Sequence, residues 1–227
     1  MKLFIACIIL FLTSFGFSQN TPSAHEKLGG WYILDGQHRL ADKYSIRTAI
    51  HVRTFEFFDN MNLTFYNAAL NHITNKNLTL TIGYCYLDID PTFSIAGESH
   101  LYENRPYEEI TFKHQLSNLN IGHRLRLEHR FLNFKQDNTI ENRFRYRIGA
   151  KLKINNFLYA FVHEELFLNL EGKAFTENRL TSGFEIPISR KNFVRMGYFN
   201  HEINRQNLHR ILLGLFIKTD LRGKKSL

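Results

Sequence analysis

The sequence predicts an all-β fold, an antiparallel up-and-down transmembrane β-barrel of about 10 to 12 strands with a charged interior. Three observations predict it. Apolar and charged residues alternate over long stretches, and a period of two is typical of strands. The alternating segments run for about 11–15 residues, against ~5–6 in soluble folds and the ~9–11 that cross a bilayer obliquely. Aromatic residues make up 14% of the chain and recur towards segment ends, where membrane barrels carry aromatic girdles.

The clearest alternation runs from Leu119 to Ile154, as two strands joined by a short polar loop. In the first strand, Leu125 and Leu127 alternate with arginine and glutamate, and the second strand repeats the pattern. Arginine outnumbers lysine on these charged faces, and arginine is the better bidentate partner for a carboxylate. We therefore expect a cluster of paired charges facing the lumen. With one position from each of two later strands, it comprises Arg124, Arg126, Glu128, Arg130, Glu141, Arg143, Arg145, Arg147, Glu165 and Arg179.

The first 18 residues are predicted to be a cleavable secretory signal. Lys2 precedes an apolar run, and Gly16 and Ser18 stand before a cut at Gln19. A lipoprotein signal at Cys7 is the alternative, but the apolar run continues past that cysteine. The expected organisation is a signal peptide at 1–18, a flexible lead-in at 19–27, a barrel domain at 28–221 and a tail at 222–227.

Composition excludes several classes of protein. The formal net charge is +8, but the basic residues are dispersed among glutamates, and export makes nucleic acid a poor partner. Outer-membrane lipid and internal carboxylates are better counter-charges. After signal cleavage Cys85 is the only cysteine, so no intramolecular disulfide forms. No later stretch offers the ~18 apolar residues of a transmembrane helix.

Each predicted strand is an alternating segment that ends at a cluster of turn residues such as Asp, Asn, Ser and Lys. Adjacent Glu164 and Glu165 blur the alternation of the eighth segment, which indicates a β-bulge there. Links near 42, 75, 118, 156 and 190 look short, and the intervening links look mostly longer. The strands are expected at 28–40, 44–55, 61–73, 78–88, 106–116, in both halves of 119–154, and at 157–170, 177–188, 193–203 and 208–220.

The segment count conflicts with the usual barrel rule. Eleven segments give an odd number, whereas single-chain bacterial barrels have even numbers. The ten segments from Tyr44 to Asp220 would close evenly by themselves. The segment around Trp31 is then an additional strand, or a twelfth strand exists that the pattern does not mark.

Several short motifs together resemble a family of predicted bacterial outer-membrane barrels that is catalogued as a domain of unknown function. They are WYILDGQHRLADKYSI, ENRPYEEI, RLRLEHR, RFRYRIG, EELFLN and RMGYFNH, spread over nearly all of the mature chain. The resemblance implies a fold and a location in the outer membrane of a Gram-negative cell, and it brings no catalytic residues. Positions that look like its recurring pattern are Trp31, Arg105, Arg126, Glu128, Arg130, Arg143, Arg147, Glu165 and Arg179.

No catalytic motif is visible. Ser99-His100 is a reversed, loop-located pair, in contrast to the His-x-Ser or Gly-x-Ser-x-Gly arrangements of hydrolases. His163 beside two glutamates, and His201 beside Glu202, are weak candidates for a cation. We therefore expect no enzyme activity, no cofactor and no metal.

The predicted role is structural, or that of a narrow porin-like pore or binding barrel for a small anionic solute, because an arginine-lined passage favours anions. One rival is an outer-membrane lipid hydrolase with a site at the rim. Another is a soluble periplasmic lipocalin-like carrier, which would hold its apolar faces inside.

Overall fold

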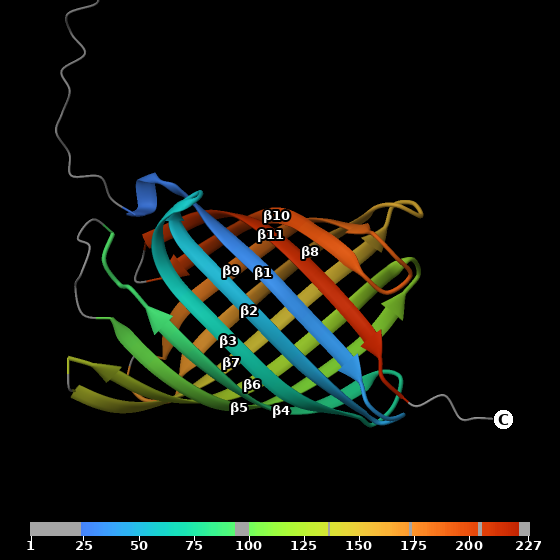
Figure 1. The fold of residues 1–227 in the computed structure, drawn as a ribbon, viewed down its shortest axis with the longest axis horizontal. Coiled ribbons are helices and arrows are strands. Elements are labelled where there is room, and N and C mark those ends of the chain that lie inside the picture. The colour runs from blue at the N-terminus through green and yellow to red at the C-terminus, as the bar shows by residue number, and fades with distance from the viewer. Residues whose placement is uncertain (1–23, 94–99, 136, 173, 204–205, 223–227) are drawn as a thin grey trace, which may run out of the picture.

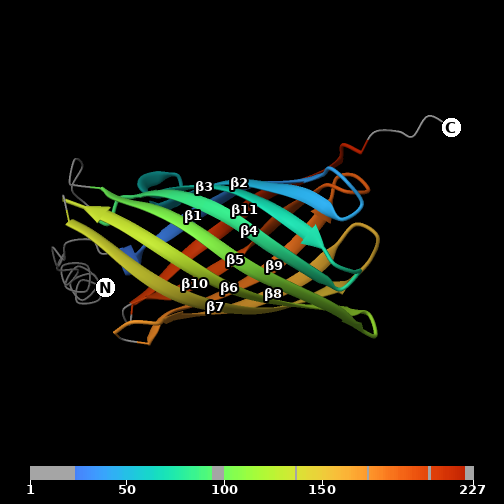
Figure 2. The same cartoon turned by 90° about the horizontal axis from the view of Figure 1, so that it is seen from below.

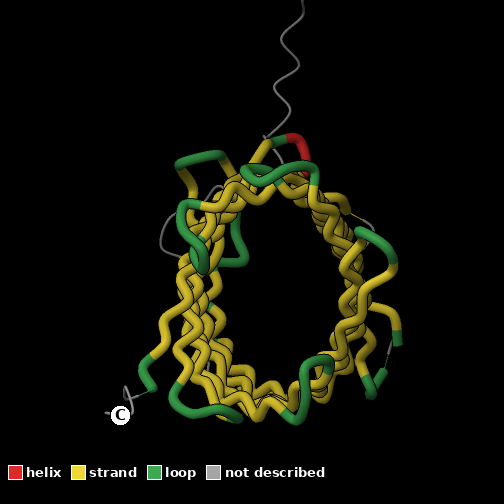
Figure 3. The backbone as a smooth tube through the Cα atoms, turned by 90° about the vertical axis from the view of Figure 1, so that its right-hand side faces the viewer, coloured by secondary structure: helices red, strands yellow, loops and turns green. Residues whose placement is uncertain are grey.

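The computed structural model describes residues 24–93, 100–135, 137–172, 174–203 and 206–222. A short 3-10 helix, η1 (Ala24–Glu26), precedes strands that close into a barrel (Figure 1). Seen from one end, the strands form a continuous ring (Figure 3). They are β1 (Leu28–Arg39), β2 (Tyr44–Glu56), β3 (Asp59–Ile73), β4 (Leu78–Ile89), β5 (Leu101–Leu116), β6 (Leu119–Phe134), β7 (Asp137–Lys153), β8 (Tyr159–Asn169), β9 (Phe175–Pro187), β10 (Phe193–Ile203) and β11 (Gln206–Asp220).

The barrel closes through a parallel pair of strands. Consecutive strands are antiparallel, but β1 lies between β2 and β11 and runs parallel to β11, from Leu28 opposite His209 to Arg39 opposite Asp220. The Trp31 segment is therefore an additional full strand, and the described residues form a barrel with an odd number of strands. An odd number of alternating strands makes the first and last run the same way, so a parallel seam follows. The predicted fold class, a mainly antiparallel barrel of 10 to 12 strands, is confirmed.

No helix in the described parts of the chain is long and apolar enough to cross a membrane. The predicted signal peptide, 1–18, lies outside the described residues, as do most of the lead-in and tail.

Strand β5 begins at Leu101, five residues earlier than the sequence pattern indicated. Pro106 was expected to start the strand, but it lies within the strand, opposite Tyr84 of β4. Proline lacks an N–H, and the pairing of β5 with β6 correspondingly omits residues 105 and 106 without a change of register. The longer strand adds two buried charged residues, Glu103 and Arg105.

The predicted bulge at Glu164 and Glu165 is wrong. Both residues keep regular pairing, and the irregularity in β8 falls between Phe167 and Leu168. Glu164 hydrogen-bonds Asn178 at an exposed site, whereas Glu165 is buried. The two side chains therefore still point to opposite faces of the sheet, although both residues are glutamates.

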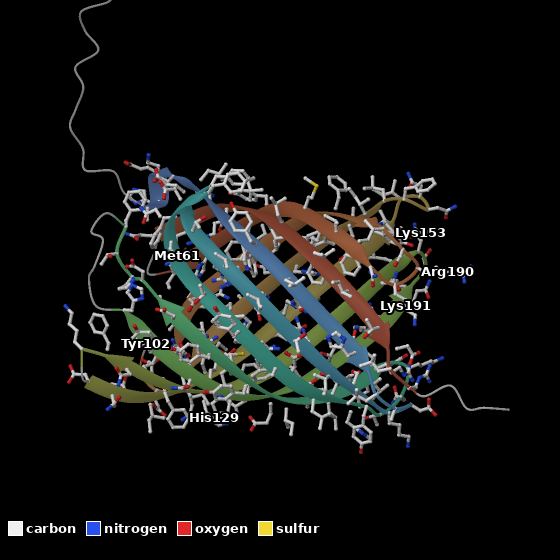
Figure 4. All side chains as sticks on the ribbon, in the orientation of Figure 1. Met61, Tyr102, His129, Lys153, Arg190 and Lys191 are labelled. Carbon is white, nitrogen blue, oxygen red and sulfur yellow. The ribbon has the colours of Figure 1, made fainter. Side chains whose placement is uncertain are left out.

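The two ends of the barrel differ less in loop length than expected. We call the end with links 40–43, 74–77, 117–118, 154–158 and 188–192 the turn end, and the opposite end the loop end. At the loop end only the link 90–100 is long. Pairing continues to Glu56 opposite Asp59 and Phe134 opposite Asp137, which leaves two-residue links there. The end of β11, Lys153, Arg190 and Lys191 lie at the turn end (Figures 1 and 4).

Apolar side chains cover the outside of the barrel and charged side chains fill the inside. Leu34, Ile50 and Ile148 are each at least 42% exposed, whereas Arg124 and Arg145 are at most 7% exposed. The strands are 11–17 residues long and strongly tilted (Figure 2), and they carry this division along the whole wall. Burial is thus inverted relative to a soluble domain, whose apolar side chains lie in the core.

A few polar side chains interrupt the outer face, and they contact one another. His129 lies 2.7 Å from the Asn142 Oδ1 atom and 3.3 Å from the carboxylate of Glu108. His129 and Tyr102 both lie towards the loop end (Figure 4). The outer face is therefore apolar with local polar pairs rather than uniformly apolar.

Candidate lumen site

The predicted lumen cluster lies on four adjacent strands of one wall. Six of its members are buried, and the other four are partly buried. Glu141 is the most exposed carboxylate of the set, with 37% of its side chain accessible, and it pairs with Arg130 at 2.7 Å. The structure brings all ten residues into one inner surface, because they occupy alternate positions of paired strands.

Glu128 is the centre of this surface. Its side chain is fully buried and contacts four arginines. Arg143 donates two hydrogen bonds to its Oε2 atom, at 3.0 and 2.7 Å, and Arg145 donates to Oε1. Arg105 and Arg126 reach the same Oε1 atom at 3.7 and 3.6 Å. One carboxylate thus contacts guanidinium groups from three strands.

Further carboxylates connect the remaining arginines into a network. Glu103 accepts hydrogen bonds from Arg105 at 2.6 Å and from Arg130 at 2.7 Å. Across the lumen wall, Glu177 binds Arg143 at 2.9 Å and Arg179 at 2.6 Å. Burying a guanidinium group removes it from water, and the attraction within one isolated buried ion pair often does not offset that cost. Here each carboxylate is shared by several guanidinium groups, so each group has more than one favourable contact. Further links join Arg124 and Arg145 to Glu165, and Arg124 and Arg126 to Glu109.

Aromatic rings hold the guanidinium planes in place. Phe167 is fully buried, and the guanidinium carbons of Arg145 and Arg179 lie 4.4 and 4.2 Å from its ring centre. Arg126 lies 3.9 Å above the ring of Tyr107. That ring covers Gly83, where any side chain would meet it at 2.3 Å. The arginines are fixed by stacking as well as by charge.

Sequence reasoning missed about half of the inner surface. Arg105 was indicated only by the family resemblance, and Glu103 was lost with the start of β5. Glu109 and Glu177 follow the same alternation as the predicted positions, and this signal could have identified them. The opposite wall is less regular, because aromatic and aliphatic residues there interrupt the charged positions. Its missed charged residues are Asp35, Arg47, Arg53, Arg195 and Arg210.

Two cavities occupy the lumen. The first, of about 360 Å³, lies among the network and an apolar wall that includes Trp31, Leu63 and Leu87. The second, of about 770 Å³, lies towards the turn end, where Lys76 and Gln115 line it. Both are lined by the same four arginines, which we call the arginine junction: Arg47, Arg124, Arg147 and Arg195. Since these residues line both cavities, the junction lies between them.

Arg147 differs from the other members of the junction. Arg47 pairs with Asp35 at 2.7 Å, Arg195 pairs with Glu185, and Arg124 pairs with Glu165. No hydrogen bond or ion pair joins the guanidinium of Arg147 to any other described residue. Its charge is therefore the one in the junction that protein carboxylates do not neutralise directly.

The other predicted candidates do not assemble into a site. His163 lines the cavities, whereas neighbouring Glu164 belongs to the outer face. His201 binds Glu177 at 2.8 Å in the lumen. No group of three or more possible metal ligands occurs within the described ranges. Ser99 lies outside those ranges, and His100 pairs with Asp88 at 2.6 Å near the loop end.

Comparison with known proteins gives a family. No curated protein matches the sequence. A solved structure titled "NanC porin structure in rhombohedral crystal form" is similar, with 14% identity and a TM-score of 0.49 over 81% of this chain and 96% of that chain. A family model matches residues 28–211, which span β1 to β10 and the start of β11. The chain therefore belongs to the family described as "Protein of unknown function (DUF2490)".

Proposed function

We propose that this protein is an outer-membrane β-barrel that forms a narrow, anion-selective passage for small solutes. The observation that carries the proposal is Arg147, an unpaired arginine at the junction between the two lumen cavities. Rings of arginine or lysine favour anions in pores, because the local potential raises anion concentration and repels cations.

The outer face supports the membrane part of the proposal. Apolar side chains that are more than a third exposed occur on each of the strands β1 to β10. In water such a surface would be an aggregation hazard, whereas in hydrocarbon it is the expected composition. The closed barrel pairs every strand, which lipid requires, since an unpaired edge would leave backbone groups without partners. Export by the predicted signal at 1–18 would deliver the chain to the periplasm.

The lumen geometry favours slow, selective passage over a wide pore. Long arginine and glutamate side chains line the interior. Ion pairs such as Arg143–Glu128 and stacking on rings such as Phe167 hold them in place. Among the described residues, the two lumen cavities provide room for a solute. Where a passage narrows at charged groups, a solute of opposite charge binds there briefly before it moves on. Such weak binding makes the passage selective and still lets the solute leave.

The rival functions have less support. A lipocalin-like carrier requires apolar side chains inside the barrel, but most of the large apolar side chains lie outside. The candidate pair of a rim hydrolase, Ser99-His100, has the reverse of the His-x-Ser order and lies in a loop.

Reversing the charge of Arg147 is expected to change ion selectivity. Arg126 and Arg145 are unsuitable for this test, because both are held in the carboxylate network and reversal of their charge would damage the fold. In planar bilayers under a KCl gradient, the wild type should favour Cl⁻. Arg147→Glu should lower the Cl⁻/K⁺ permeability ratio about tenfold, since two units of charge change within a few ångströms of the ion path.

The matched control is Arg190→Glu, which makes the same charge change in an exposed turn at the turn end. It should alter the ratio far less, because surface charge is screened by salt. Flat recordings from correctly folded protein would overturn the passage. Equal effects of the two variants would overturn the role of Arg147.

A further inference from the structure

The first lumen cavity contains a second arginine without a partner, Arg53 on β2. It is 8% exposed and lines the cavity. No hydrogen bond or ion pair joins its guanidinium to another described residue, and its Nε atom is buried without a partner. Such a group is costly, because a buried charge normally has both an opposite charge and hydrogen-bond acceptors.

Aromatic rings hold Arg53 where it stands. Its guanidinium carbon lies 4.4 Å from the ring centre of Trp31 and 5.5 Å from that of Phe199. Trp31 and Phe199 themselves meet edge to face at 4.5 Å. Stacking leaves the edge of a guanidinium available for hydrogen bonds, so Arg53 is oriented without being neutralised.

The groups around Arg53 add to the positive charge that carboxylates in this cavity do not compensate. Arg53 is repelled electrostatically by Arg179 and Arg210, and only Glu177 among its main charged neighbours attracts it. That carboxylate already binds Arg143, Arg179 and His201. Buried nitrogen atoms without partners occur on Trp31, Arg179, His201 and Arg210 as well. The anion that this part of the lumen requires is not supplied by the described residues.

The wall beside Arg53 is apolar. Leu63 lies directly opposite Arg53 in the pairing of β2 with β3, and Phe65 and Leu87 continue the apolar lining. Leu212 lies opposite Trp31 on the other side. The cavity of about 360 Å³ falls at the small end of the range for small-molecule sites, about 300–1,000 Å³.

We propose that this cavity binds a small monocarboxylate with a compact apolar body. The carboxylate would take both hydrogen bonds of the Arg53 guanidinium edge, and the body would lie on Leu63, Phe65 and Leu87. A carboxylate matches one free guanidinium fork in shape and charge. The proposal names the substrate class of the passage and rests on the proposed function for its role in transport, although binding can be measured without transport.

Trp31 provides the assay, since it is the only tryptophan in the chain and contacts Arg53. The barrel, folded in detergent, is titrated with phenylacetate while Trp31 fluorescence is followed. Acetate lacks the apolar body, and 2-phenylethanol lacks the charge. Phenylacetate should saturate the signal. The analogue 2-phenylethanol should bind at least about tenfold more weakly, since a hydrogen-bonded charge contributes that much. Acetate should also bind at least about tenfold more weakly, because it buries no apolar body.

Arg53→Met should weaken phenylacetate binding by at least about tenfold, because it removes the charge-assisted hydrogen bonds. It should fold normally, as it removes an unpaired buried charge. Lys153→Met, at the turn end, removes a charge far from the cavity and should bind phenylacetate like the wild type. A second variant, Leu63→Asn, should weaken phenylacetate binding and leave acetate binding unchanged.

Several results would overturn the site: no saturable phenylacetate signal, equal binding of 2-phenylethanol, or unchanged affinity in Arg53→Met. If Arg53→Met does not fold, an unchanged phenylacetate affinity in Leu63→Asn would overturn the site instead. Bilayer recordings separate this proposal from the passage itself. Flat recordings with intact phenylacetate binding would overturn transport alone, whereas conductance without binding would overturn the site alone.

Discussion

The Glu128→Gln variant is expected to lose about 3–5 kcal/mol of unfolding free energy, the usual cost of removing one partner from a buried charge network. Glu128 is fully buried and touches Arg105, Arg126, Arg143 and Arg145. Glutamine keeps the size of the side chain but removes the charge and one acceptor oxygen. Four buried guanidinium groups would then lose their common counter-charge.

The measurement is urea unfolding of the barrel in lipid vesicles, followed by Trp31 fluorescence. Glu171→Gln is the matched control, because Glu171 is exposed in the link between β8 and β9 at the loop end, where it accepts a hydrogen bond from Asn142 at 3.1 Å. It should change the unfolding free energy by less than about 0.5 kcal/mol. Similar losses in the two variants would mean that the lumen network does not stabilise the barrel.

The Ile50→Arg variant is expected to lose about 2–4 kcal/mol of unfolding free energy in vesicles, the cost of arginine at the bilayer midplane of a barrel. Ile50 is 44% exposed on the middle of β2, between outward Leu34 and Tyr66. In a water-soluble barrel the same change would alter stability by less than about 0.5 kcal/mol, because the side chain would already be solvated.

Depth provides the control for Ile50→Arg. Phe58 is 76% exposed in the link between β2 and β3 at the loop end. Arginine near the membrane interface costs only about 0–1 kcal/mol, so Phe58→Arg should have a small effect. If both variants unfold like the wild type, the outer face does not contact hydrocarbon.

The sequence predicts the walls of this barrel well because the side-chain period of a strand is two. Alternation alone places Arg124 and Arg126 on one face and Leu125 on the other, and the structure has the same division. The same reasoning fails where the type of a residue does not indicate its position in the strand or the face that it occupies. Glu164 and Glu165 are alike in charge yet face opposite sides, and Pro106 lies within a strand that it was expected to start.

The partners within the lumen could not be predicted from the sequence. Arg143 and Glu177 are 34 residues apart and meet only because β6 to β9 curve into a closed wall. Whether an arginine is paired depends on that closure, and alternation gives no information about it. Arg145 and Arg147 look equivalent in the sequence, yet only Arg145 is neutralised by carboxylates.

The central claim is that the apolar face meets lipid while the charged face encloses the lumen, and fluorescence quenching by brominated lipid tests it most directly. In the wild type, Trp31 lines the lumen cavity. The double variant Trp31→Phe, Ile50→Trp moves the single fluorophore to the outer face of the neighbouring strand. Brominated acyl chains should quench the double variant strongly and leave wild-type Trp31 nearly unquenched. Strong quenching of wild-type Trp31 together with an unquenched double variant would contradict the account.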